Sequence, residues 1–131
     1  MRFTKAHGLG NDFVILDGWR ETSIVGAPLG ALAKAMCERS RGVGADQLLT
    51  LEPPTDEARR EGAVVRMRVF NADGCEAEMC GNGVRCIARL AGERGYASSS
   101  DSIVVETMAG MKRCEILPNG EVRVGMGRAR F

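Results

Sequence analysis

The pattern of apolar and polar residues predicts several short strands in this chain of 131 residues. The clearest is the stretch 64–70, where three apolar side chains alternate with two arginines, as in a strand with one buried face. Asn119-Gly120 lies between two similar patterns and predicts a hairpin turn. We expect strands over residues 3–5, 13–16, 47–51, 64–70, 103–107, 111–117 and 121–126.

Two helices are predicted by apolar spacing. Residues 28–39 begin with a proline, which suits a first helical turn, and carry one apolar face. A second helix begins near Cys80, because apolar residues follow at i, i+3, i+4 and i+7 from Val84, and Gly95 is a plausible stop. Residues 52–62 are charged and contain two prolines, so we expect a solvated loop there. No linker divides the pattern, which favours a single domain over 1–131.

The start of the second helix is the first candidate for chemistry. The N–H groups of a first helical turn lack helical partners, and the helix dipole favours negative charge beside them. A thiol at Cys80 would therefore lose its proton more easily, and a carboxylate could bind the same N–H groups. Gly81 and Gly83 carry no side chain that would block its approach. From this pattern alone, a small buried hydrophobe at Cys80 is an equally good interpretation.

Three amides lie in an expected loop or at the ends of expected strands. Asn11 lies in a glycine-bearing loop with His7, Gln47 begins a strand, and Asn71 follows the strand 64–70. An amide can bind the ammonium or the carboxylate of an amino acid. The simpler interpretations are a turn residue for Asn11 and an exposed polar residue for Gln47. His7 is interpreted as structural, since a lone histidine beside a glycine turn usually is.

Composition and charge exclude several classes of function. Hydrophobic residues make up 44% and charged residues 27% of the chain, which is typical of a globular protein, and the net charge is +1. This balance gives no electrostatic reason to expect binding to nucleic acid or to a membrane. Five cysteines with one histidine lack zinc-site spacing, so we expect no metal. An N-terminus without an apolar signal region and an odd cysteine count favour a cytoplasmic location.

Three segments together resemble one family, the diaminopimelate epimerases. They are residues 3–18 (FTKAHGLGNDFVILDG), 41–49 (RGVGADQLL) and 70–86 (FNADGCEAEMCGNGVRC). The resemblance implies an α+β fold, in which a mixed, mostly antiparallel sheet curls around a central helix as one of two similar halves. It also implies an isomerase that interconverts LL- and meso-diaminopimelate, for lysine and cell-wall precursor synthesis, without pyridoxal phosphate or any other cofactor.

The resemblance implies roles for individual residues. Cys80 would be one of two catalytic cysteines that exchange the α-proton from opposite sides of the stereocentre. Gly81 and Asn82 would hold the substrate α-carboxylate through their N–H groups. The remaining substrate-binding residues would be Asn11, Gln47 and Asn71.

The sequence also departs from the family. The second catalytic cysteine normally lies in an ACGTGA-like motif of the C-terminal half, and residues 1–131 contain no such motif. We therefore expect half of a two-base site, completed by a missing C-terminal half or by a homodimer. Cys75 stands where a serine is expected. Three alternatives remain: a racemase of the proline racemase type, an inactive domain that self-associates, and a thiol-redox pair of Cys75 with Cys80.

Overall fold

The computed structural model describes residues 2–8, 10–24, 26–97 and 102–125, which form an α+β fold of two sheets and three α-helices. None of the helices in these ranges is long and apolar enough to cross a membrane. In chain order the elements are β1 (Thr4–Gly8), β2 (Asn11–Asp17), a 3₁₀ turn (Thr22–Ile24), α1 (Leu29–Cys37), β3 (Gln47–Leu51), α2 (Asp56–Arg60), β4 (Val65–Arg66), β5 (Val69–Asn71), β6 (Glu76–Ala77), α3 (Gly81–Glu93), β7 (Ser102–Thr107), β8 (Gly110–Ile116) and β9 (Val122–Gly125).

The larger sheet has five strands in the order β1-β2-β3-β5-β6. Its neighbours are antiparallel, except that β2 and β3 run parallel. The register places Phe13 of β2 opposite Gln47 of β3, and Gln47 opposite Asn71 of β5. Two of the predicted amides are therefore direct cross-strand neighbours.

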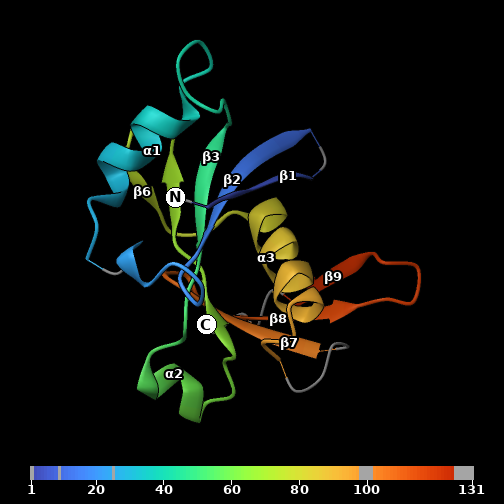
Figure 1. Cartoon of the computed structure of the whole chain (residues 1–131). Coiled ribbons are helices and arrows are strands. Elements are labelled where there is room, and N and C mark those ends of the chain that lie inside the picture. Colours follow the sequence, from blue (N-terminus) through green and yellow to red (C-terminus); the bar gives the residue numbers. More distant parts are fainter. Residues whose placement is uncertain (1, 9, 25, 98–101, 126–131) are drawn as a thin grey trace, which may run out of the picture.

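Helix α3 lies between this sheet and the four-stranded sheet β4-β7-β8-β9 (Figure 1). Its apolar face contributes Val84, Ile87, Ala88 and Ala91 to a core that both sheets complete. These are the four positions that the helical spacing predicts. The helix is central because its apolar residues are buried among strands of both sheets.

Helix α1 covers the opposite face of the five-stranded sheet (Figure 1). Leu29, Ala33 and Cys37 pack there against residues such as Val14 and Leu48. Because side chains alternate along a strand, the residues between these point toward α3. The larger sheet thus packs against α1 with one face and against α3 with the other.

The expected α+β fold, with a mixed, mostly antiparallel sheet curled around a central helix, is confirmed, and the curled surface consists of two sheets. The strand predicted over 64–70 is divided between them: Val65–Arg66 pairs with β7, and Val69–Asn71 pairs with β3. Val65, Met67 and Val69 still share one core, so the alternation is correct. The alternation of apolar and polar residues predicts which face of a strand is buried, but it does not predict which strand will be its partner.

Two other expectations about local structure were wrong. Residues 52–62 contain α2, whose first turn is capped by Thr55 because its hydroxyl accepts a hydrogen bond from the Ala58 N–H at 3.3 Å. His7 and Asn11, expected in a glycine-bearing loop, belong instead to two antiparallel strands, because β1 extends to Gly8 and β2 already begins at Asn11. Of the strand expected over 121–126, residues 122–125 form β9, and Met126 lies outside the described residues.

Candidate active site at the start of helix α3

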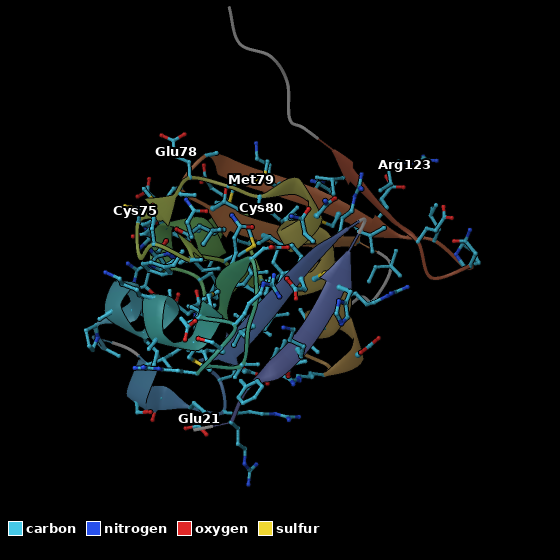
Figure 2. All side chains as sticks on the ribbon, turned by 90° about the horizontal axis from the view of Figure 1, so that it is seen from above. Glu21, Cys75, Glu78, Met79, Cys80 and Arg123 are labelled. Carbon is cyan, nitrogen blue, oxygen red and sulfur yellow. The ribbon has the colours of Figure 1, made fainter. Side chains whose placement is uncertain are left out.

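Cys80 caps the N-terminus of α3. Its backbone is extended (φ −135°, ψ 116°), and its Sγ accepts a hydrogen bond from the Gly83 N–H at 3.4 Å. Figure 2 shows Cys80 farther inside the molecule than Cys75 and Glu78, which lie at its rim. The sulfur therefore replaces the usual oxygen of a capping side chain and remains half-buried.

The next two N–H groups of the helix are unoccupied. Within the described ranges, no protein acceptor bonds the N–H of Gly81 or Asn82. Gly81 is exposed, and a Cβ built on it would meet no atom within 4 Å. An acceptor from outside the domain therefore has room to reach this turn, where the helix dipole favours negative charge.

Gly83 has a different role from Gly81. A Cβ at this position would lie 3.1 Å from Leu49 Cδ1 and 3.3 Å from Cys80 Cβ. The expectation that Gly83 leaves space for a ligand is therefore wrong, since β3 fills that space. The glycine lets the start of α3 pack closely on the sheet.

The predicted amides lie on the sheet face that points toward α3. Leu49, two residues after Gln47, packs on that side, and Phe13, two residues after Asn11, belongs to the same core. Gln47 Nε2 donates to Asn71 Oδ1 at 2.8 Å. On the face that points toward α3, each of the three strands β2, β3 and β5 therefore carries an amide two residues from an apolar core residue.

A second amide pair links the sheet to the helix. Asn82 Nδ2 in the first turn of α3 donates to Asn11 Oδ1 in β2 at 2.9 Å. The fold therefore brings all six predicted residues to the region where α3 starts, on three strands and one helical turn. An arrangement of amides and free N–H groups beside a thiol is suited to a small molecule with a carboxylate.

Three other cysteines are poorly suited to proton transfer. Burial raises the pKa of the Cys37 and Cys86 thiols, and it raises the pKa of Cys114 to about 11. Each is therefore held as a neutral thiol near neutral pH. Cys75 is exposed in the turn before β6.

Of the two glutamates that precede α3, Glu76 is held by the fold. Both oxygens of Glu76 accept from Arg68, each at 2.9 Å, and this contact lowers the pKa of Glu76. Glu78 is exposed. Over the described ranges, no three His, Cys, Asp or Glu side chains are grouped so as to hold a metal.

Two clefts flank the Asn11–Asn82 pair. One of about 500 Å³ is lined by Asn82, Arg85, Cys86 and Arg89, with the β8–β9 hairpin. The other, of about 430 Å³, is lined by Asn11 and five neighbours that include Arg39. His7 lines both. Cys80 is not among the residues that line these two clefts.

Comparison with known sequences decides the family. The family model described as diaminopimelate epimerase matches residues 3–131. The chain belongs to the diaminopimelate epimerase family. A diaminopimelate epimerase of Desulforudis audaxviator is 51% identical over 134 residues, which cover 100% of this chain and 45% of the relative. One of Carboxydothermus hydrogenoformans is 47% identical and covers 98% and 44%. This chain therefore spans less than half the length of these epimerases.

Solved structures support the fold of this epimerase-family chain. A probable proline racemase from Agrobacterium radiobacter superposes with a TM-score of 0.69 at 18% identity, covering 95% of this chain and 41% of the other. A hydroxyproline epimerase from Agrobacterium vitis gives a TM-score of 0.66 at 16% identity, covering 95% and 40%. At such identities the likeness concerns the fold alone.

Sequence reasoning missed a group of charged residues beside the amides. Asp12 follows Asn11, and Asp46 precedes Gln47, and both carboxylates accept from Arg39. A signal was present in the dipeptides Asn-Asp and Asp-Gln, each of which joins a candidate amide to an acid.

Proposed function

We propose that this chain is the N-terminal half of a diaminopimelate epimerase, and that Cys80 is one of its two acid–base residues. The observation that carries the proposal is the position of Cys80 at the cap of α3, with its Sγ 3.4 Å from the Gly83 nitrogen. A thiolate formed there is stabilised by that N–H and by the helix dipole. It would remove the α-proton of LL- or meso-diaminopimelate.

The neighbouring N–H groups supply the second part of the mechanism. Removing an α-proton places negative charge on the substrate carboxylate. The N–H groups of Gly81 and Asn82 would hold that carboxylate, and one fixed donor of this kind can contribute about 2.7–4 kcal/mol to transition-state stabilisation. Asn11, Gln47 and Asn71 would bind the other polar groups of the substrate. No cofactor is required in this scheme.

The second proton donor must come from another segment. Burial raises the pKa of three of the four other thiols, so they are poor donors, and Cys75 is exposed away from the cap. We infer that a second half closes over Cys80, either as a C-terminal half of the kind that the longer relatives have or as a second copy of this chain. Closure would also exclude water from the reacting carbon. The proposed location is the cytoplasm, where a working thiol stays reduced.

The test is α-proton exchange in deuterated water. The chain is incubated with LL- or meso-diaminopimelate, alone and together with a separately expressed C-terminal half from a relative, and the α-proton signal is followed by NMR. Cys80→Ala and Cys75→Ala are compared with the wild-type chain. We expect exchange that Cys80→Ala abolishes and Cys75→Ala leaves unchanged.

Three results are informative. Exchange by the chain alone would indicate that it completes its own site, and exchange only with the added half would indicate a divided site. Exchange that persists in Cys80→Ala would refute the role of Cys80. Proline in place of diaminopimelate serves as the substrate control, because selective exchange of proline would favour the proline racemase type.

A further inference from the structure

A charged cluster lies directly behind the amide pair of β2 and β3. Asp12 and Asp46 are adjacent in chain order to Asn11 and Gln47, and the backbone N–H of each donates to the other residue. The Asp12 N–H donates to Asp46 Oδ2 at 2.9 Å, and the Asp46 N–H donates to Asp12 O at 3.0 Å and to Asp12 Oδ1 at 2.9 Å. The start of β2 is thereby joined to the residue that precedes β3.

Arg39 connects the two carboxylates. Its Nη2 lies 3.1 Å from Asp12 Oδ1 and 3.0 Å from Asp46 Oδ1, and its Nη1 donates to Asp12 Oδ2 at 3.2 Å. Lys5 adds an ion pair to Asp12 at 3.1 Å. Without these cations, two carboxylates at one strand junction would repel each other. The Arg39 contact is also the main cause of the strongly lowered pKa of Asp12.

The acidic residues and the amides leave the same strands in opposite directions, although Asn11 and the charged cluster line one cleft at the strand ends. Side chains of successive strand residues point to opposite faces, so Asp12 lies on the α1 side while Asn11 lies on the α3 side. Arg39 follows closely on the last residue of α1. A change in the position of Asp12 or Asp46 must therefore move the backbone that carries Asn11 or Gln47.

We propose that Arg39 is a positioning residue, which fixes the backbones of Asn11 and Gln47 by bridging Asp12 and Asp46. This inference rests on the proposed function, in which both amides contact the substrate. The guanidinium fork is required, because one planar group has to serve two carboxylates. Arg39 acts through Asp12 and Asp46, which hold its guanidinium in place at the rim of the cleft that Asn11 also lines.

The test compares Arg39→Met and Arg39→Lys with Arg59→Met in this chain. Arg59 is a matched control: its side chain is 58% exposed, against 60% for Arg39, and it pairs with Asp56 in α2 at 3.5 Å. One readout is the side-chain amide signals of Asn11 and Gln47 in ¹⁵N NMR spectra. The other is the dissociation constant for meso-diaminopimelate, from titration of the Gly81 and Asn82 backbone signals.

We expect Arg39→Met to shift and broaden both side-chain signals and to weaken binding about tenfold, since small misplacements of binding groups are costly. Arg39→Lys should recover part of this effect, because its ammonium pairs with one carboxylate at a time. Arg59→Met should change neither readout. Unchanged amide signals in Arg39→Met would overturn the proposal, as would shifted signals with unchanged affinity.

The two proposals fail in different ways. If the wild-type chain does not bind meso-diaminopimelate, the proposed function loses its support, and the amide signals still decide whether Arg39 positions the two residues. If Arg39→Met does not fold, Asp46→Ala replaces it, because this change removes the acceptor of the Asp12 N–H. Its amide signals are then expected to shift, and unshifted signals would overturn the positioning role.

Discussion

Leu49 of β3 packs so closely on Gly83 of α3 that a Cβ at position 83 would lie 3.1 Å from Leu49 Cδ1 and 3.2 Å from Leu49 Cδ2. Leu49 is fully buried, so its side chain has little room to move. The same Cβ would lie 3.3 Å from Cys80 Cβ. The distance between the helix start and the sheet therefore depends on the absence of a side chain at Gly83.

Gly83→Ala is expected to destabilise the domain. Overpacking of a filled core costs about 1–3 kcal/mol, which exceeds the gain in helix propensity of about 1 kcal/mol. Unfolding by urea, followed by the fluorescence of the single tryptophan, measures the change.

Gly81→Ala is the control, because its methyl group would meet no protein atom within 4 Å. It should leave the free energy of unfolding unchanged or raise it, while weakening binding of meso-diaminopimelate. Equal destabilisation by both substitutions would contradict this distinction.

The Arg68–Glu76 ion pair leads to a prediction on pH. Arg68 lowers the pKa of Glu76 from its ordinary value of 4.5, so the folded state favours the carboxylate more than the unfolded state does. The resulting stability is present above the unfolded pKa and is lost as the pH falls through the lowered pKa. At pH 7, Glu76→Gln should lower the free energy of unfolding by about 0.5–1 kcal/mol.

The pH dependence of the unfolding free energy distinguishes the contribution of the ion pair from that of side-chain packing at position 76. Wild type and Glu76→Gln should converge in stability as the pH falls from the ordinary value of 4.5 through the lowered pKa of folded Glu76, below which the carboxyl is protonated in both states. Denaturant unfolding at pH 7, 5, 4 and 3 provides the comparison. A difference that stays constant over this range would mean that the ion pair does not contribute.

Local features of the site could be predicted from the sequence, because neighbouring residues determine them. The apolar spacing from Val84 to Ala91 identifies the buried face of α3, and this places Cys80 at its start. Gln47 and Asn71 stand at strand ends in the sequence and in the structure, whereas Asn11, expected in a loop, is the first residue of β2. Their assigned roles stay predictions.

Features that depend on distant partners could not be predicted. The stretch 64–70 changes sheet between Arg66 and Val69, because its two ends meet different partner strands. Arg39 is 27 positions from Asp12, and nothing in the local pattern links them. Gly81 and Gly83 look equivalent in the sequence, and only the position of Leu49 separates a glycine open to a ligand from one required by packing.

The cysteines should differ in their rates of alkylation. All five are free, Cys75 is exposed and Cys80 is half-buried, whereas Cys37 and Cys114 are buried. With iodoacetamide near pH 7.5, Cys75 and Cys80 should be modified first and Cys114 last, because burial raises the pKa of Cys114 to about 11 and removes its thiolate. Mass spectrometry of peptides gives the order.

Ligand protection refines the alkylation experiment. Meso-diaminopimelate should slow the modification of Cys80 and leave that of Cys75 unchanged, so Cys75 acts as an internal control. Equal protection of both thiols would argue against a site at the start of α3. A Cys75–Cys80 disulfide in freshly purified protein would instead favour the redox alternative.

The far end of α3 is held by the buried carboxylate of Asp17. It accepts from Tyr96 Oη at 2.6 Å and pairs with Arg94, while Tyr96 stacks on Trp19 with ring centroids 5.0 Å apart. Asp17→Ala would leave the Arg94 charge mostly buried without its partner, which costs about 3–5 kcal/mol. Tyr96→Phe keeps the stacked ring and loses one hydrogen bond, worth about 1 kcal/mol.

Urea unfolding at pH 7 compares these variants with Asp56→Ala, which removes the exposed carboxylate of the Arg59 pair. Circular dichroism is the appropriate probe, because Trp19 belongs to the altered cluster. We expect the loss of stability to fall in the order Asp17→Ala, Tyr96→Phe, Asp56→Ala, with the last below about 0.5 kcal/mol. If Asp17→Ala lowered the free energy of unfolding no more than Asp56→Ala does, burial would not strengthen the contact between Asp17 and Arg94. The end of α3 opposite Cys80 would then be held by its apolar face alone.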